Sequence, residues 1–577
     1  MSGPERPEKS SRDDPLWEAD FDWVEVPRAP EPDAAATAHP DPSTAGEPER
    51  PLGTAASNRR RIAVSTAFFS AATGLSRVAG LVREVVAASL FGVSAAMSAF
   101  TIAFMVPNLV RSLFADAAIQ AAFVPVFTEL LEKGQRREAF RLASTMIYLV
   151  GLVLGVLTLF FVLVAPLVIP LFAPGFDGAN EQLVIVLSQF LFPILVLLGL
   201  TGMVAGILNS YDRFGAFAIS PLFWNIAIIV VLAAATPLFE GRDQIYAYAI
   251  GVLVGTVIQL AINAFDLRRT PFRPQWVFDW RSPTVRRVLV LMLPVTISLG
   301  LINFNLAINA IFGSLVSEEA PAAIDKAFRI YMLPQGIFSV AIATVLFPTL
   351  ARFAARDQLD DLRETMASGM RQIVLLLVPA MAVMLVLAEP ITRLLYQRGV
   401  FDAGDTELVA TALFWFAFSL PFNGLFLLLT RTFFSLQRPW VPTAISVGNL
   451  AITAIAALLL YESAGIAGIV AATVIATAAS VAAQAWVLRG ELGRLELGAL
   501  LAATLKVGVA AAALAGAAYL VWFGLDSLLG RALLAQVASL GVALAVGIAV
   551  FVAAVTALRV REAAQIIALV RSRPGGA

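Results

Sequence analysis

The sequence predicts an all-α protein that crosses a membrane many times. Hydrophobic residues make up 59% of the 577 positions, and the mean hydropathy is +0.81, whereas soluble domains are only about half apolar. Apolar segments long enough to span about 30 Å of hydrocarbon follow one another along most of the chain. Parts of the first half also recur in the second half. We therefore expect a polytopic membrane protein built from two related halves.

The hydropathy pattern predicts about fourteen transmembrane helices. They are expected near residues 62–91, 95–127, 140–172, 181–209, 216–238, 244–266, 285–314, 322–352, 364–388, 404–435, 441–461, 465–489, 498–523 and 532–558.

Residues 1–58, before the first span, have a different composition. They hold 13 acidic against 5 basic residues, many prolines and no signal-peptide pattern. Such a segment buries too little apolar surface to fold alone, so we expect a disordered cytoplasmic tail. The cluster Trp17, Phe21 and Trp23 indicates either a short partner-binding motif or, more simply, part of a solvated acidic stretch.

Residue types that are absent or rare limit the chemistry. The chain has no cysteine and one histidine, His39, which lies in the tail. Thiolate or histidine metal sites in the membrane are therefore excluded, and we expect no metal, cofactor or nucleic-acid partner. There is no Walker motif for ATP either.

Charges between the spans predict the orientation of the chain. Segments that follow even-numbered spans are rich in bases, as at 133–141, 268–287 and 352–363. Segments that follow odd-numbered spans are poor in bases. The basic residues in these segments are Arg242, Lys326, Arg393, Arg398 and Arg531. Because basic loops stay in the cytoplasm, we expect both termini on the cytoplasmic side of the cytoplasmic (inner) membrane.

An internal repeat of about 224 residues relates the two halves. Phe123-Val-Pro125 matches Leu346-Phe-Pro348, and Asn225 aligns with Asn449. Six spans separate the copies, so both copies share one orientation in the membrane. We expect six-helix lobes at 59–280 and 281–490 that face each other across a cavity, followed by two extra helices and a cytoplasmic tail at 491–577.

The first expected hairpin carries unusual charge. Arg77, Arg83 and Arg111 lie in otherwise apolar spans, with the acids Glu84 and Asp116 near them. Each arginine costs about 2.5 to 3.5 kcal/mol at a helix centre, which favours a polar cavity over lipid. The second half has no arginine that matches Arg77 or Arg83.

The second half contributes Arg329 instead, early in the eighth expected span. Guanidinium groups stay charged and bind phosphate oxygens in pairs, so four arginines among apolar walls predict a site for a bulky anion. Each arginine taken singly has an alternative: it reaches the membrane interface or pairs with a carboxylate. Glu84 and Asp116 are gate residues or charge partners.

The same residues resemble a known family. The stretch Ser76-Arg77 to Arg83-Glu84, then Phe104-Met-Val-Pro107-Asn108-Leu-Val-Arg111 to Asp116 and Phe123-Val-Pro125, resembles the MurJ (MviN) lipid II flippases of the MOP exporter superfamily. The resemblance covers residues 62 to about 560. It implies transport, without catalysis, of undecaprenyl-diphosphate-linked muropeptide to the outer leaflet for peptidoglycan synthesis and cell shape.

The resemblance also implies site residues and partners. The essential cavity arginines of the family match Arg77, Arg83, Arg111 and Arg329. Lipid II and membrane lipids are the expected partners, and cell-wall synthesis proteins are possible partners of the N-terminal tail.

Two departures from the family pattern stand out. Ser98 replaces a carboxylate that the family commonly has. Asn449 and Thr453 stand where sodium-coupled members carry an acid, and span 7 offers Asn303, Asn305 and Asn309 without one. Sodium coupling is therefore not expected.

Two rival functions remain from the sequence. One is an exporter of another polyprenyl-linked glycan or of drugs, with the same fold. The other is a membrane enzyme acting on polyprenyl phosphates, which would need paired carboxylates for Mg²⁺ or a nucleophile with a base.

Overall fold

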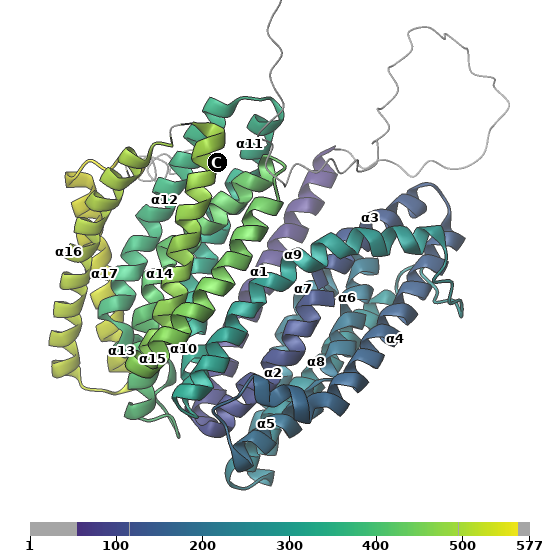
Figure 1. Cartoon of the computed structure of the whole chain (residues 1–577), viewed down its shortest axis with the longest axis horizontal. Helices are drawn as coiled ribbons and strands as arrows, with labels where there is room; N and C mark the ends of the chain where they lie inside the picture. Colours follow the sequence, from purple (N-terminus) through teal and green to yellow (C-terminus); the bar gives the residue numbers. More distant parts are fainter. Residues whose placement is uncertain (1–54, 115, 494, 564–577) are drawn as a thin grey trace, which may run out of the picture. The chain divides into compact units, whose positions relative to one another are not determined.

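The computed structural model describes residues 55–114, 116–493 and 495–563, without the side chains of 55–70, 111–121, 293–303 and 497. Every regular element of these residues is helical (Figure 1). Ten helical segments among them are long and apolar enough to cross a membrane, which confirms the all-α membrane fold. The number fourteen and the lobe boundaries stay predictions. The expected tail falls almost wholly outside the described residues.

The helices of the first half follow the expected spans, with one break at a proline. The fourth span is divided into α5 and α6, where Pro193 precedes the first turn of α6. The second span is described as α2 and α3, on either side of residue 115, which lies outside the described residues. The bounds are α1 Ala55–Phe91, α2 Ala95–Phe114, α3 Asp116–Glu132, α4 Arg136–Val168, η1 Ile169–Leu171, α5 Gly178–Leu191, α6 Ile194–Ser210, α7 Gly215–Ala235, η2 Thr236–Leu238, η3 Gly241–Gln244 and α8 Ile245–Leu267.

The second half contains two further irregularities. A π-helical turn, η4, follows Pro334 and separates α10 from α11. Gly465, at φ +55°, divides α15 into the two helices expected there. The bounds are α9 Pro283–Val316, α10 Ala320–Pro334, η4 Gln335–Ser339, α11 Val340–Ala355, α12 Leu359–Val386, α13 Ala388–Tyr396, α14 Ala403–Ser435, α15 Trp440–Leu492, α16 Leu497–Leu529 and α17 Leu533–Ala557.

Helix α9 connects the two halves. It contacts α3 near its start, where Arg287 pairs with Glu129 at 3.0 Å, and α15 further along, where Asn305 donates to Asn449 at 2.9 Å. Figure 1 shows it running obliquely from the first half to the second. The long helix therefore packs against both halves of the chain.

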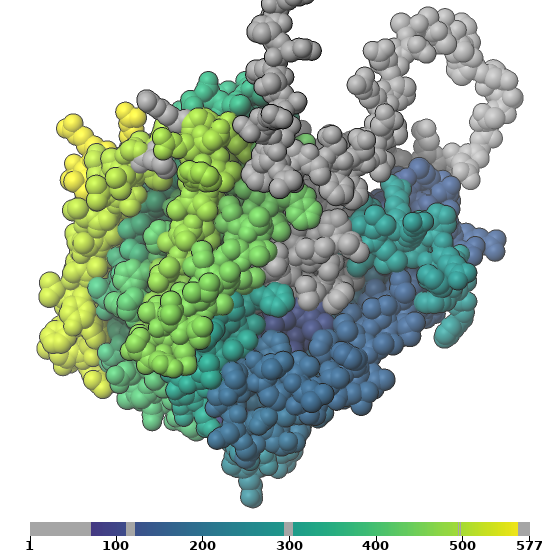
Figure 2. Space-filling model, in the orientation of Figure 1, coloured from purple at the N-terminus to yellow at the C-terminus, as the bar shows by residue number. Residues whose placement is uncertain are grey.

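Helices α16 and α17 pack on each other, α16 also packs on α12 and α17 on α13, and their side chains form the outer edge of the second half in Figure 2. Much of that edge is apolar and exposed, as at Leu505 and Leu520, which suits contact with lipid tails. Two largely buried ion pairs connect this C-terminal part of the chain to α12 and α13. The Nε atom of Arg371 donates to Glu562 at 2.6 Å, and Arg393 pairs with Asp526.

Candidate functional site

A cavity of about 720 Å³ lies between the two halves. One wall comes from α1 and α2, and the other from α9, α10, η4, α13 and α14. The walls are largely apolar, with Phe100, Phe104, Phe328, Met332 and Phe416 among the lining residues. A hollow between the two halves was expected from the repeat.

The cavity brings together three of the four predicted arginines, Arg77, Arg83 and Arg329. Arg77 is exposed in the hollow and reaches the opposite wall, since a Cβ placed on Gly336 would lie 3.7 Å from its guanidinium. The fourth, Arg111, lies in α2, and Asp116 begins α3. The side chains of these two residues are outside the described set, so their predicted roles stay predictions.

A chain of ion pairs crosses the cavity. The Oε1 atom of Glu84 lies 2.5 Å from a guanidinium nitrogen of Arg83 and 3.1 Å from one of Arg329. The Nε atom of Arg329 then donates to Asp325 at 2.8 Å. Glu84 lies on α1 and Arg329 on α10, so this carboxylate joins the two halves. Of the two readings of Glu84, the pairing with arginines is observed, whereas its action as a gate stays a prediction.

Arg83 is held more rigidly than the other two arginines. It is buried, and its guanidinium carbon lies 4.7 Å from the centre of the Trp224 ring. A cation over an indole face is stabilised by the ring quadrupole. Arg83 is thus fixed on the α1 wall, whereas the side chain of Arg329 is 35% exposed.

The sequence does not single out Asp325 and Tyr396, which line the cavity, or Lys326, which lies next to Tyr396 outside the lining. Lys326 was counted with the bases outside the spans, and that assignment was wrong, because the side chain is fully buried in α10. Spacing offered a signal. Asp325, Lys326 and Arg329 lie within one turn and share a helix face. Tyr396 comes from a different part of the chain, and nothing local indicates its place in the cavity.

Hydrogen bonds between the halves close one end of the cavity. The Val400 N–H donates to the Ser89 carbonyl at 2.9 Å, and the Val93 N–H donates to Asp405 at 2.9 Å. We call this region, residues 89–93 of one half against 399–405 of the other, the closed end. Three further hydrogen bonds join the two halves beside it: Ala322 N–H to Ser98, Gly175 N–H to Ser314, and Asn180 to Glu318.

The closed end lies among loops that are poor in bases. Residues 91–95 and 172–181 contain none, and by the distribution of basic residues this is the predicted external side. Ser98, which replaces a carboxylate common in the resembled family, accepts a hydrogen bond there.

Polar residues of α9 and α15, including Asn449, are hydrogen-bonded to one another. Asn305 donates to Asn449, Asn449 donates to Ser480 at 2.9 Å, and Thr473 donates to Asn309 at 3.2 Å. No cluster of three metal-binding acids or histidines occurs within the described ranges. These side chains act as contacts between helices α9 and α15.

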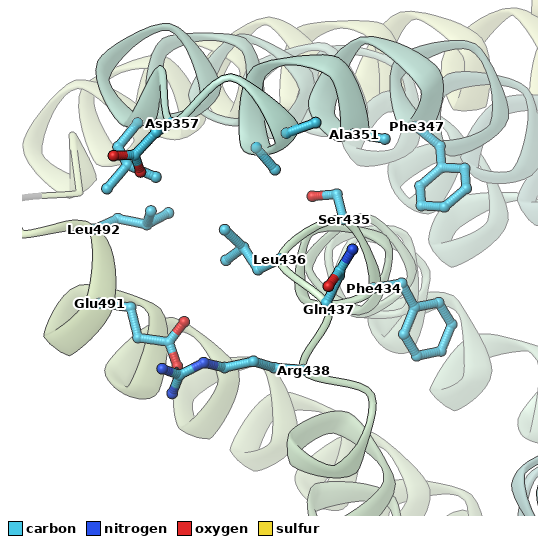
Figure 3. A pocket seen from close by; sticks show the side chains of 13 residues that line it. Phe347, Ala351, Asp357, Phe434, Ser435, Leu436, Gln437, Arg438, Glu491 and Leu492 are labelled. Carbon is cyan, nitrogen blue, oxygen red and sulfur yellow. The ribbon is translucent and has the colours of Figure 1, made fainter. Parts of the chain in front are cut away.

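A second hollow of about 620 Å³ lies where α11, α14 and α15 end (Figure 3). Its arginine, Arg438, meets Glu491 along one edge of the hollow and pairs with it at 2.9 Å. This hollow has one paired arginine from a single half, whereas the cavity around Arg77 is lined by arginines of both halves.

Comparisons with known proteins agree with this architecture. The family model described as lipid II flippase MurJ matches residues 87–528. The chain is 34% identical to the probable lipid II flippase MurJ of Rhizobium meliloti (strain 1021) over 407 residues, covering 70% of this chain and 76% of the relative. It is 30% identical to the lipid II flippase MurJ of Burkholderia cenocepacia, covering 69% and 78%.

Solved structures share the fold. A lipid II flippase MurJ in an inward closed conformation superimposes with a TM-score of 0.70 at 22% identity, covering 85% of this chain and 98% of that one. An inward-facing multidrug resistance MATE transporter of the MOP superfamily gives 0.60 at 16% identity, covering 73% and 95%. On the extent of the family match and the identity to these relatives, the chain belongs to the MurJ lipid II flippase family.

Proposed function

We propose that this protein carries lipid II from the inner to the outer leaflet by alternating access. In this proposal Arg77, Arg83, Arg111 and Arg329 hold the diphosphate. Family membership supports the substrate class. The observation that carries the proposal for the site is the single cavity that arginines from both halves line.

The charge of the cavity favours an anion. Its described lining has three arginines, Arg77, Arg83 and Arg329, against two carboxylates, Glu84 and Asp325, which leaves one positive charge in excess. Within those described residues no ion pair to Arg77 occurs. Apolar walls lower the local dielectric, so a diphosphate would gain more from these guanidiniums than it would in water.

The ion-pair chain supplies a physical basis for alternation. Glu84 holds Arg329 across the halves in the present arrangement. A diphosphate brings more negative charge than one carboxylate and accepts bidentate hydrogen bonds from guanidinium. Its arrival would therefore compete for Arg329, weaken the link between α1 and α10, and favour separation at the closed end while the polyprenyl tail stays in lipid.

The membrane potential would help. With the predicted orientation, the diphosphate moves from an inside-negative compartment outward. Each negative charge that crosses 100 mV gains about 2.3 kcal/mol. Transport of this kind needs neither ATP nor a bound cation.

A second candidate function, export of a different polyprenyl-diphosphate-linked glycan, would use the same cavity and the same arginines. Drug export in the manner of the MATE neighbours fits less well, because an organic cation would meet a cavity of net positive charge. Translocation assays that compare lipid II, another diphosphate-linked glycan and a cationic dye would separate these functions.

The site is tested in proteoliposomes. Arg77→Ala and Arg329→Ala should each slow lipid II translocation by about 10- to 100-fold, the equivalent of one charge-assisted hydrogen bond. Arg438→Ala is the matched control, because that arginine lines the other hollow and pairs with Glu491. Parental rates in both cavity variants would exclude the anion site.

A further inference from the structure

Lys326 is a cation that neither the ion-pair chain nor the cavity surface uses. Its side chain is fully buried in α10, and among the described residues its Nζ atom has no hydrogen-bond partner. Ionisable groups inside membrane proteins are costly, and they usually mark a pathway for substrate or ions. Lys326 is therefore a candidate to bind an ion that passes through the protein.

The carboxylates of the ion-pair chain leave Lys326 without a partner. The nearest carboxylates, Glu84 and Asp325, already have guanidinium partners in Arg83 and Arg329. Two acids and two arginines balance within the ion-pair chain, and the next carboxylate near Lys326, Asp405, already accepts a hydrogen bond from the Val93 N–H, so Lys326 has no carboxylate partner. A basic side chain that lies next to a proposed anion site and has no carboxylate partner can pair with an anion that enters the site.

One ring separates Lys326 from the cavity. Its Nζ atom lies 5.5 Å from the centre of the Tyr396 ring, and Tyr396 lines the cavity. Tyr396 is itself buried, and its hydroxyl has no partner in the described part of the chain. Displacement of this ring would place the ammonium in the hollow.

The position of Tyr396 links it to the closed end. It is the last residue of α13, and four residues later the Val400 N–H bonds to Ser89 on α1. Separation of the halves at the closed end breaks that bond and frees the segment that carries Tyr396. Lys326 itself lies one turn from Arg329, on the side of Ala322, whose N–H bonds across the halves to Ser98.

We propose that Lys326 is a second cation for the diphosphate, hidden behind Tyr396 in this arrangement and exposed when the closed end opens. This inference rests on the proposed function and extends it. Arg329 would hold the anion while the closed end is shut, and Lys326 would receive it one helical turn nearer the exit. An ammonium is a strongly hydrated point charge without the fork of arginine, so it suits a site from which the anion must leave.

The absence of cysteine from the chain permits a direct test of exposure. Lys326→Cys is reconstituted with lipid II and treated from either side with membrane-impermeant methanethiosulfonates, one anionic and one cationic. We expect labelling from the external side only, and faster labelling by the anionic reagent because Arg329 is near. Ala412→Cys, fully buried within the second half, is the control that stays unlabelled.

A cross-link at the closed end completes the test. Ser89→Cys with Val400→Cys joins backbones that already share a hydrogen bond, and oxidation should hold the closed end shut. Labelling of residue 326 should then stop and return on reduction. Absence of labelling during transport, or labelling that the disulfide does not change, would overturn the inference.

Transport by side-chain variants tests the charge. Lys326→Met should lower translocation by about tenfold or more, the loss expected for one charge-assisted contact, whereas Lys326→Arg should keep most of it. Thermal melting of both variants shows that each is folded. If Lys326→Met transports normally while Arg77→Ala and Arg329→Ala do not, this inference fails and the proposed function stands. If all three transport normally, both fail.

Discussion

Replacing Glu84 with glutamine should destabilise the arrangement in which the closed end is shut. Glu84 is buried and holds Arg83 and Arg329 through one carboxylate oxygen. Glutamine keeps the shape and one acceptor but removes the charge. A hydrogen bond to a charged group contributes about 1.5 to 3 kcal/mol. Because Arg329 is 35% exposed and keeps Asp325, we take the lower end of that range, about 1.5 kcal/mol.

A loss of this size shifts the conformational equilibrium about tenfold, from molecules in which the two halves meet at the closed end toward molecules in which they have separated there. The shift is measured with one introduced cysteine, Val93→Cys, in the otherwise cysteine-free chain. Val93 is buried at the closed end, and its N–H bonds to Asp405. An impermeant thiol reagent should label it about tenfold faster when Glu84→Gln is also present.

A matched control separates this effect from general loosening. Asp266→Asn removes a carboxylate that pairs with Arg213 at 2.5 Å within the first half, so it should leave labelling of Val93→Cys unchanged. Equal labelling rates with glutamate and with glutamine at position 84 would refute the reasoning that this ion pair joins the halves.

Three further predictions follow from the packing. Gly399→Ala should also speed labelling of that cysteine, because Gly399 has φ +63° and a Cβ there would lie 2.2 Å from the Ser89 carbonyl oxygen; an unchanged rate would contradict the assigned contact. Arg371→Ala removes the 2.6 Å ion pair with Glu562, so thermal unfolding in detergent should occur at a lower temperature, the equivalent of about 1 to 3 kcal/mol. Replacing external sodium with potassium should not slow transport, because Asn449 and its partners are neutral and already hydrogen-bonded; a sodium requirement would show that coupling had been misassigned.

Much of the fold could be predicted from the sequence, because membrane spans have a simple physical signature. Long apolar runs must form helices in lipid, where every backbone polar group needs a partner. Each expected span coincides with helical residues, even where Pro193 or Gly465 divides the run. The repeat anticipated two halves with a hollow between them.

The arginines were found for a related reason. Arg77, Arg83 and Arg329 stand out because charge inside an apolar run is costly, and one cavity accounts for all three. The sequence does not specify partners in the same way. That Glu84 would pair with Arg329 depends on how α1 and α10 approach each other, more than 200 residues apart in the chain.

Lys326 shows where span-based reasoning fails. Its charge near a span boundary suggested a loop, but α10 begins at Ala320 and buries it. Whether a charge near a boundary is solvated or buried depends on the neighbouring helices, here α13 with Tyr396. Hydropathy along one segment does not contain that information.

The most direct test of the central claim is an experimental structure with undecaprenyl diphosphate bound. We expect phosphate density in the cavity between the halves, with oxygens about 3 Å from the guanidiniums of Arg77 and Arg329. Density for the headgroup at the hollow beside Arg438, or on the lipid-facing surface with the arginine cavity filled only by water, would contradict it.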